Sequence, residues 1–555
     1  MTATAAREAT RAAADRSPAG RSADNVLAGT VTLVRFMLRR DRIKLSAWLL
    51  GITVLLLYFA KVVLPGIAGT DEGLEDLRRF MEGASGAVMG PGYGRDDITS
   101  ERYIAGVYGL FFFVLTALMS MQLVSRHTRV EEQNGRAELV RSNVVGRHAP
   151  LTAVVIVAVG ANVLLALMLG GAMAASGFDG GEGLLFGAGV GAVGLVFAGI
   201  TALTVQVTEH SRAATGMAGA VLGAAWVVRV AGDMIRDFGS PLSWASPLAW
   251  SNQTRPYVDG RWWPLLLSLG LAVAAAAAGY ALSARRDVGA GLVAARPGKP
   301  VGAPWLRSPL AAAFRLQRAS LIWWTVALAA FGFLFGGLAD QIADHEGMSE
   351  DRIEMFGGSM ATLVNGYLSV ITVLMAVLAG IMVVLGVMAV RSEETRGRAE
   401  PVLATATSRW AWFGSYLAVV SIGVVGLLLV VGFATGIGAA ASVGDGAYIW
   451  DVTLAHLAHA PGVLVLLGIT ALLFGVLPRA IGVTWVVLGY SLFAGLFGAI
   501  TDHPQWLRNL SPVEHTGQPP LDGISWAASM ILLVVAAGLA AAGLAGFRRR
   551  DLESK

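Results

Sequence analysis

Hydrophobic residues make up 55% of this 555-residue chain, and charged residues only 14%. A water-soluble globular protein of this length needs more polar surface, so the composition excludes soluble enzymes and predicts a membrane protein. The chain contains no cysteine, which excludes disulfide bonds, thiolate metal sites and cysteine nucleophiles. We do not read the formal net charge of +4 as nucleic-acid binding, because a membrane protein divides its charges between two aqueous sides.

The first 44 residues precede the first long apolar run. Residues 1–25 are rich in Ala, Arg and Thr and hold no apolar core of the kind found in signal peptides, so we expect a disordered cytoplasmic tail. Residues 26–44 place apolar side chains at helical spacing between basic ones. This pattern predicts an amphipathic helix lying on the anionic surface of a membrane.

Apolar runs recur along the rest of the chain, and each is long enough to cross a hydrocarbon core of about 30 Å as a helix. We predict about twelve spans, at residues 45–66, 102–125, 151–175, 184–207, 215–234 and 263–283 and then at 320–339, 361–390, 411–436, 456–477, 481–500 and 524–546. The predicted domains are a first transmembrane half at 45–283, a cytoplasmic linker with a second interfacial helix at 284–319, a second transmembrane half at 320–547 and a cytoplasmic tail at 548–555.

Lysine and arginine gather in the segments on one side of this map, and acidic residues gather on the other. Because positively charged loops stay in the cytoplasm, the pattern predicts that both termini are cytoplasmic. The heavy use of Ala, Gly, Val and Arg is typical of a high-GC bacterium, so we expect the bacterial plasma (inner) membrane. An even number of spans in each half predicts an all-α polytopic membrane protein built from two parallel six-helix repeats.

Each half carries a similar charged segment after its second span, at Arg129–Arg147 and Arg391–Arg409. The identical pairs are Arg129/Arg391, Glu131/Glu393, Glu132/Glu394, Gly135/Gly397, Arg136/Arg398, Ala137/Ala399, Glu138/Glu400, Val140/Val402 and Arg147/Arg409. Acidic residues favour the start of a short helix, and a glycine permits a bend after it. A polar loop repeated beside a membrane favours a docking site for another protein over a solvated connection.

Proline- and tryptophan-rich segments follow the fifth span of each half, at residues 238–263 and 502–522. Proline interrupts a helix and tryptophan prefers the headgroup level of a bilayer. Re-entrant or interfacial hairpins are therefore expected at these two places.

A few polar side chains within the spans have both a structural and a functional interpretation. Arg229 and Asp233 stand one helical turn apart and should pair, either on a substrate exit path or as a structural ion pair. His456 and His459 have a spacing at which they could share a metal, but no carboxylate motif accompanies them, so a role at the membrane interface is favoured. We predict no catalytic residue and no metal site in this chain.

Four motifs make the chain similar to permeases of the ABC-exporter superfamily (type-2 membrane domain), and in particular to the fused, double-length exporters of polyketide antibiotics and multiple drugs. They are H-T-R-V-E-E-Q-N-G-R-A-E-L-V at His127–Val140, its copy at Arg391–Val402, T-E-H-S-R-A-A at Thr208–Ala214 and R-R-D-V-G-A-G-L at Arg285–Leu292. The resemblance extends over nearly the whole chain from Leu33.

The resemblance implies that each repeated loop is a coupling helix seated in a cleft of a separate ATPase subunit. Two ATPase copies, with their ATP and Mg, would be the partners, and this chain would bind no cofactor itself. That assignment fits the lack of a G-x-x-x-x-G-K-[ST] phosphate loop in the sequence. The residues implied in ATPase coupling are Glu131, Glu132, Gly135, Arg136, Glu138 and Arg147, and then Glu393, Glu394, Gly397, Arg398, Glu400 and Arg409. Pro401 replaces Leu139 in the second copy, and we expect it to end the second coupling helix earlier.

The sequence therefore predicts the permease subunit of an ATP-driven exporter that moves hydrophobic, antibiotic-like or lipid-like compounds out of the cell. Membrane lipids and a hydrophobic small molecule are the other expected partners, and nucleic acid is not. The alternative is a proton-driven secondary efflux transporter with twelve helices, which would need a titratable group near the middle of the membrane. A membrane-embedded enzyme is a third class, for which His456 and His459 are the only candidates.

Overall fold

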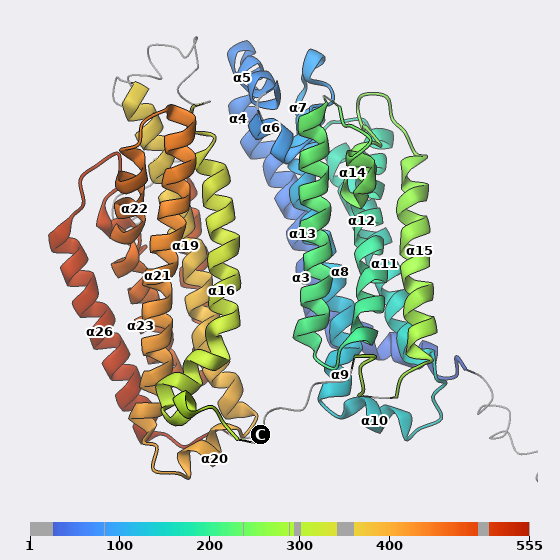
Figure 1. The fold of residues 1–555 in the computed structure, drawn as a ribbon. Helices are drawn as coiled ribbons and strands as arrows, with labels where there is room; N and C mark the ends of the chain where they lie inside the picture. The colour runs from blue at the N-terminus through green and yellow to red at the C-terminus, as the bar shows by residue number, and fades with distance from the viewer. Residues whose placement is uncertain are drawn as a thin grey trace, which may run out of the picture. The chain divides into compact units, whose positions relative to one another are not determined.

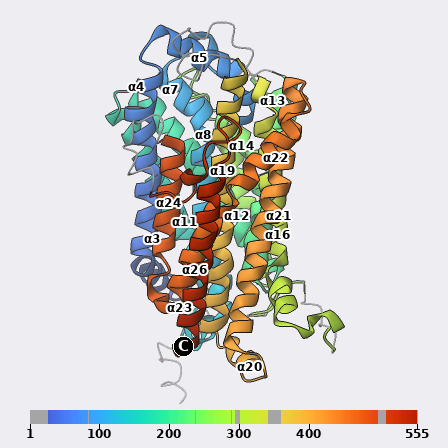
Figure 2. The same ribbon diagram turned by 90° about the vertical axis from the view of Figure 1, so that its left-hand side faces the viewer.

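The computed structural model describes residues 26–82, 84–236, 238–287, 289–293, 301–340, 360–497 and 510–553. The chain divides into two compact units, residues 1–298 and 299–555. Each unit has its own apolar core. The described residues form helices and connecting loops, without a strand among them, as Figures 1 and 2 show. The predicted all-α polytopic fold is thus confirmed.

Unit 1 contains long helices joined by short helical segments. The long helices are α3 (Thr30–Tyr58), α8 (Gly109–His127), α11 (Ala149–Ala175), α12 (Gly180–Val207), α13 (Ser211–Ile235) and α15 (Pro264–Ser283). The short segments are η1 (Phe59–Val63), α4 (Leu64–Ile67), α5 (Asp71–Glu82), α6 (Ala84–Met89), η2 (Arg95–Asp97), α7 (Ser100–Tyr103), η3 (Ile104–Tyr108), α9 (Arg129–Gln133), α10 (Arg136–Arg141), η4 (Ser243–Ala245) and α14 (Pro247–Asn252).

Unit 2 repeats this arrangement. Its longer helices are α16 (Pro309–Gly336), α19 (Met360–Thr395), α21 (Arg409–Val443), α22 (Tyr448–Ala458), α23 (Ala460–Val476), α24 (Val483–Phe497) and α26 (Trp526–Arg549). The short segments are η5 (Pro304–Arg307), α20 (Ala399–Leu403), η6 (Pro478–Ala480) and η7 (Glu514–Thr516).

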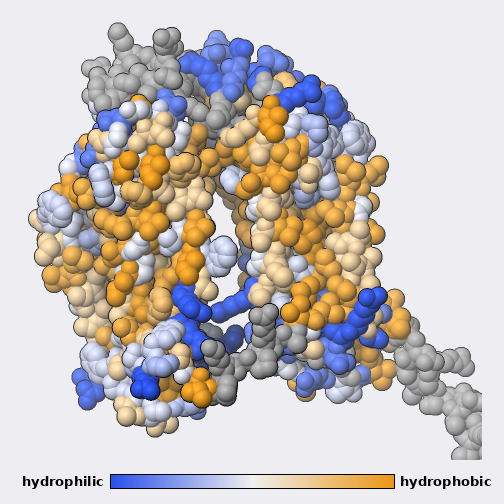
Figure 3. Space-filling model, viewed as in Figure 1, coloured by the Kyte–Doolittle hydropathy of each residue, from blue (hydrophilic) through white to orange (hydrophobic). Residues whose placement is uncertain are grey.

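Eleven of the described helices are long and apolar enough to cross a membrane. They coincide with eleven of the predicted spans, with α22 and α23 together forming one of them. For the predicted span at 481–500, the structure describes α24 over Val483–Phe497, and residues 498–509 lie outside the described part. The predicted tail at 1–25 also lies outside it. In Figure 3, apolar side chains cover the middle of the helices in each unit and hydrophilic ones gather toward both ends.

The N-terminal amphipathic segment and the first span belong to one helix. The sequence predicts a change of element at 44/45, but α3 continues without interruption from Thr30 to Tyr58. Just before α3, the Ala28 carbonyl oxygen accepts a hydrogen bond from the Gly146 amide at 2.9 Å, and further along Arg40 pairs with Glu131 at 2.7 Å. The start of α3 therefore crosses the end of the unit, from the start of α11 to the end of α8. We call this the α10 end of unit 1.

Glycines make the closest helix contacts, and they stand at equivalent places in both units. The equivalent contacts are Gly199–Ala272 with Gly468–Ala536, and Gly279–Ala202 with Gly543–Ala471. They join α12 to α15 in unit 1 and α23 to α26 in unit 2. At these points the backbones of two helices are in close contact. The matching contacts therefore align α12 with α23 and α15 with α26, residue by residue.

The segment after the fifth span of unit 1 turns back among the helices. The short helix α14 contacts α12, α13 and α15, and its Ser251 hydroxyl donates a 2.8 Å hydrogen bond to the Gly189 carbonyl oxygen of α12. Leu248 and Ala249 are buried. Trp244 and Trp263 stack beside it with ring centres 5.3 Å apart. This geometry matches a re-entrant element more closely than one lying on the membrane surface.

Candidate functional site

The first repeated loop is a bent pair of short helices. Helix α8 ends at His127, α9 covers Arg129–Gln133 and α10 covers Arg136–Arg141. Between them Gly135 has a φ of 70°, in the left-handed region where a side chain would be strained. Gly397 has a φ of 68° at the equivalent place before α20. The same backbone bend therefore occurs in both units.

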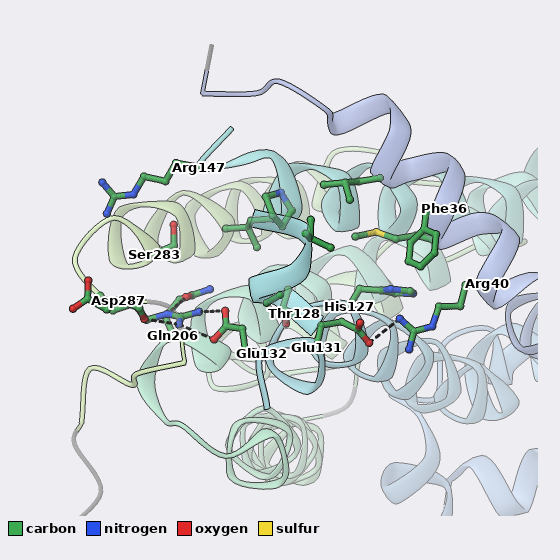
Figure 4. A pocket seen from close by; sticks show the side chains of 17 residues that line it. Phe36, Arg40, His127, Thr128, Glu131, Glu132, Arg147, Gln206, Ser283 and Asp287 are labelled. Atoms are coloured by element: carbon green, nitrogen blue, oxygen red, sulfur yellow. Dashed lines mark hydrogen bonds and ion pairs between the residues drawn. The ribbon is translucent and has the colours of Figure 1, made fainter. Parts of the chain in front are cut away.

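Glu132 of α9 binds within its own unit. Its two carboxylate oxygens accept hydrogen bonds from the Arg286 guanidinium at 2.7 and 2.8 Å. Both residues line a cavity, in which Figure 4 labels Glu132. Arg286 follows the last turn of α15, so the pair joins the loop after the second span to the end of the sixth. The Gln206 side chain of α12 accepts a further bond from Arg286 Nε at 2.6 Å. We call the Glu132–Arg286 pair the first clamp.

Arg129 supports the first clamp from behind. It donates to Glu132 at 2.7 Å, to the Val205 carbonyl oxygen at 2.7 Å and to the Ala290 carbonyl oxygen at 3.1 Å. Its side chain is fully buried. Buried guanidinium groups of this kind are stable only when each donor is satisfied, so Arg129 locks α9 against the end of α12.

Unit 2 repeats the clamp with Glu394 and Arg550. The Arg550 guanidinium binds both carboxylate oxygens of Glu394, one of them at 2.7 Å. The Glu553 amide donates a further hydrogen bond to Glu394 at 3.0 Å. Glu394 is only 2% exposed, which leaves it no surface for a partner. We call this pair the second clamp.

Arg147 and Arg409 add a second equivalent contact in each unit. Arg147 donates to the Ala284 carbonyl oxygen just after α15. Arg409 donates to the carbonyl oxygens of Phe547 and Arg548 at the end of α26. Cations in this position satisfy the open carbonyl groups at a helix C-terminus and favour its dipole. Both arginines thus bind within their unit.

Glu131 and the end of α8 hold the start of α3. Glu131 pairs with Arg40 at 2.7 Å and lies 3.9 Å from Arg136. Next to it the buried Asp41 accepts a hydrogen bond from His127 at 2.6 Å and forms an ion pair with Arg126 at 2.9 Å. In unit 2 the equivalent of Glu131, Glu393, pairs with Arg398 at 2.8 Å.

The side chains exposed on the two loops include several of the predicted coupling residues and some of their neighbours. In unit 1 Arg136, Glu138 and Leu139 are exposed, and Leu139 shows 71% of its surface. In unit 2 Arg396, Arg398, Glu400, Pro401 and Val402 are exposed. A partner would meet these side chains and that of Arg147, which is also exposed, whereas Glu132, Glu394 and Arg409 bind within the units.

Pro401 does not end its helix early, contrary to the expectation from the sequence. α20 ends at Leu403, which is the counterpart of Arg141 at the end of α10. Pro401 lies in the first turn of α20, where a backbone amide has no partner within the helix, so the missing N–H is tolerated. The two short helices end at the same position of the repeat.

Arg229 and Asp233 pair at 3.3 Å and are both buried. Arg229 also donates to the Val88 carbonyl oxygen of α6, and Asp233 accepts from the Ser243 hydroxyl at 2.7 Å. The pair therefore ties α13 to the connecting segments at the far end of unit 1. Of the two interpretations left open by the sequence, this geometry favours the structural ion pair.

His456 and His459 are fully buried beside the break between α22 and α23. His456 Nδ1 bonds to the Val452 carbonyl oxygen at 2.8 Å, and His459 Nδ1 bonds to the Thr516 hydroxyl at 2.8 Å. Among the residues that the structure describes, no group of three or more His, Asp or Glu side chains is arranged to hold a metal ion. His456 therefore bonds within α22, whereas His459 joins the break to η7.

Comparison with known proteins assigns the family. The profile of the family described as "Multidrug efflux system permease Rv1217c, C-terminal domain" matches residues 31–282 and 306–548, one range in each half of the chain. A full-length relative is the multidrug efflux system permease protein Rv1217c of Mycobacterium tuberculosis (strain ATCC 25618 / H37Rv). It is 36% identical over 536 residues, which cover 94% of this chain and 95% of that protein. The chain belongs to this family of multidrug efflux permeases.

Arg286 and Arg550, the clamp partners of Glu132 and Glu394 in this efflux permease, were not among the site residues predicted from the sequence. The repeat of Arg285-Arg286-Asp287 at Arg549-Arg550-Asp551 was visible in the sequence, but nothing there connects it to the charged loops. The structure brings the two repeated motifs together in each unit. A search for pairs of opposite charge that are duplicated together would have found both clamps.

Proposed function

We propose that this chain is the permease subunit of an ATP-driven exporter of the ABC superfamily, of the fused, double-length kind. Two copies of a separate ATPase, with ATP and Mg, would drive it, and hydrophobic antibiotic-like or lipid-like compounds would be moved out across the bacterial plasma membrane. Three observations support the proposal. The chain belongs to a family of efflux permeases, its sequence lacks a phosphate loop, and it presents two equivalent loops beyond its apolar helices.

The single observation that carries the proposal is the placement of the clamps. Each exposed short helix, α10 or α20, continues from the second span of its unit. The clamp connects the residue just before that helix to the end of the sixth span, through Glu132–Arg286 or Glu394–Arg550. A force applied to the short helix would therefore reach two spans at once. Such rigid attachment is what a loop needs if it is to pass the motion of an ATPase into the membrane.

The proposed orientation places the α10 end of unit 1, α20 of unit 2 and both termini in the cytoplasm. Its support is the distribution of lysine and arginine along the sequence, which favours cytoplasmic positions for these segments. The proton-driven alternative has less support. In the candidate spans that the structure describes, the acidic side chains lie near helix ends, except that of Asp41, which lies in the basic N-terminal part of α3 before its apolar stretch.

Co-purification with a candidate ATPase, followed by its ATP turnover, tests the proposal. The informative variants alter exposed side chains only: Arg136→Glu with Leu139→Asp in the first loop, and Arg398→Glu with Val402→Asp in the second. We expect each pair to weaken association and to uncouple turnover from transport while the permease still folds. The matched control is Asp451→Lys, an exposed charge reversal at the other end of unit 2. Transport that continues without any ATPase and stops when the proton gradient is removed would overturn the proposal.

A further inference from the structure

A cavity of about 100 Å³ lies at the α10 end of unit 1. Phe36 and Met37 of α3, Val140 of α10 and Leu151 of α11 give it an apolar wall. In Figure 4 Ser283, Asp287 and Arg147 lie on one side of it, and Phe36, His127 and Arg40 lie on the other. Arg286 of the first clamp also lines it.

The aligned repeats show what occupies the same place in unit 2. Relative to the clamp residues, Pro150 and Leu151 at the start of α11 correspond to Trp412 and Phe413 at the start of α21. Ser283 at the end of α15 corresponds to Phe547 at the end of α26. Small or aliphatic side chains in one repeat are thus replaced by aromatic rings in the other.

These rings pack into a closed cluster in unit 2. Phe547 stacks on Trp412 with ring centres 5.5 Å apart and on Phe474 at 5.5 Å, and Phe413 lies 5.4 Å from it. All four side chains are buried. The guanidinium carbon of Arg550 lies 5.0 Å from the ring centres of both Phe474 and Phe547, within the range of cation–π attraction.

We infer that the cavity in unit 1 is a binding site for a planar aromatic compound, one ring of which takes the place that Phe547 fills in unit 2. The volume is smaller than that of an apolar cavity of about 150 Å³ that binds benzene in another protein, so the site admits no more than a single ring. The wall formed by Phe36, Val140 and Leu151 supplies apolar contact. Arg286 occupies the position of Arg550 and offers a guanidinium group to the face of the ring.

A ligand in this cavity would contact both the first clamp and α10. Glu132, Arg286 and Val140 line the same space, so a bound ring would fill the gap behind the exposed loop of unit 1. In unit 2 the ring of Phe547 already fills the equivalent space. The inference rests on the comparison of the two units and does not depend on ATP-driven export.

Photolabelling of the full-length protein in detergent tests the site. The probe is a phenyl trifluoromethyl diazirine, whose carbene reacts where it is bound, and the competitor is excess indole. We expect adducts on the peptides that contain Val140 and Leu151, and we expect indole to abolish them. Adducts on Ile156 and Val163, which are exposed on the surface of α11, should not respond to indole and serve as the internal reference.

Two reciprocal substitutions give the decisive comparison. Ser283→Phe copies the side chain of unit 2 and should remove the indole-sensitive adducts; Leu151→Phe, which copies Phe413, is a second filling variant. Phe547→Ser opens the cluster of unit 2 and should create new indole-sensitive adducts around Val402 and Phe413. The inference is overturned if the wild-type adducts resist indole or persist in both filling variants. Displacement by palmitate but not by indole would also overturn it, since the occupant would then be an acyl chain.

Discussion

Glu132 and Arg286 bind each other through both carboxylate oxygens, at 2.7 and 2.8 Å, although 154 residues separate them in the chain. Their side chains are only 11% and 8% exposed. A bidentate pair with so little solvent contact has a fixed geometry, and each partner depends on the other to offset its loss of hydration. The second clamp repeats the relationship in unit 2, so the duplication has preserved a contact as well as a sequence.

Removing one partner of the first clamp should destabilise the protein strongly. Arg286→Gln leaves Glu132 with only Arg129 as a cationic partner in a site with little water, and we expect a loss of about 3 kcal/mol in the free energy of unfolding. Glu132→Gln should also destabilise the protein, because it leaves the guanidinium groups of Arg286 and Arg129 without their carboxylate partner. Thermal unfolding in detergent, followed by circular dichroism, measures both effects.

The double variant Glu132→Gln with Arg286→Gln is the control for this prediction. Because neither charge remains to be buried alone, it should recover part of the loss caused by Arg286→Gln. Additive effects of the two substitutions would show that the residues do not interact, which contradicts the clamp.

The two clamps should respond differently to lysine. Arg286→Lys keeps the charge and loses the bidentate geometry. Arg550→Lys loses the same geometry and also the stacking on Phe474 and Phe547. We therefore expect Arg550→Lys to lower the melting temperature further, by an additional free energy of about 1 kcal/mol. Equal shifts for the two variants would show that the stacking contributes nothing.

The sequence predicted the spans well because their signal is local. A run such as Ala149–Ala175 is apolar almost throughout, and a bilayer selects for that property alone. The clamps gave no local signal. Glu132 has Arg129 and Arg136 within one turn along the chain, and nothing in the sequence shows that its bidentate partner is Arg286. The repetition of Glu132 and Glu394 favoured a docking site, and the resemblance to ABC exporters implied that an ATPase would dock there; repetition also arises when an internal contact is duplicated.

The cavity could not be predicted from the sequence of unit 1 alone. Ser283 is an ordinary residue for the end of a membrane helix, and its significance comes from Phe547 at the equivalent place. The repeat of Arg285-Arg286-Asp287 at Arg549-Arg550-Asp551 aligns the ends of α15 and α26, and the close contacts of Gly279 and Gly543 agree with that alignment. The break between α22 and α23, in contrast, has a local cause, because Pro461 in the first turn of α23 has no backbone N–H to continue the hydrogen-bond pattern of α22.

The ion pair between Arg229 and Asp233 should maintain the connecting segments at the far end of unit 1. Arg229→Met removes the partner of a buried carboxylate and the donor to the Val88 carbonyl oxygen. We expect a loss of about 3–5 kcal/mol and faster proteolysis between α5 and η2. Arg236→Met, at the exposed end of the same helix, is the matched control. Unchanged proteolysis in Arg229→Met would contradict the structural role assigned to the pair.

Two glycines of α15 should respond in opposite directions to the same change. At Gly279 a Cβ atom would come within 2.8 Å of the Ala202 carbonyl oxygen of α12, whereas at Gly270 no atom lies within 4 Å. Gly279→Ala must push α15 away from α12, which we expect to cost about 1–3 kcal/mol. Gly270→Ala should be neutral or raise stability by up to about 1 kcal/mol, because alanine restricts the unfolded chain.

The same comparison can be made in unit 2 with Gly543 and Gly538 of α26. A Cβ at Gly543 would lie 2.4 Å from the Ala471 carbonyl oxygen, and Gly538 has open space around it. If the repeats are packed alike, Gly543→Ala should destabilise and Gly538→Ala should not, as in unit 1. Melting temperatures of the four variants show whether the close helix contact is the same in both units. A destabilising effect in only one unit would mean that the duplicated helices no longer share the same close contact, and the alignment on which the cavity comparison depends would then fail as well.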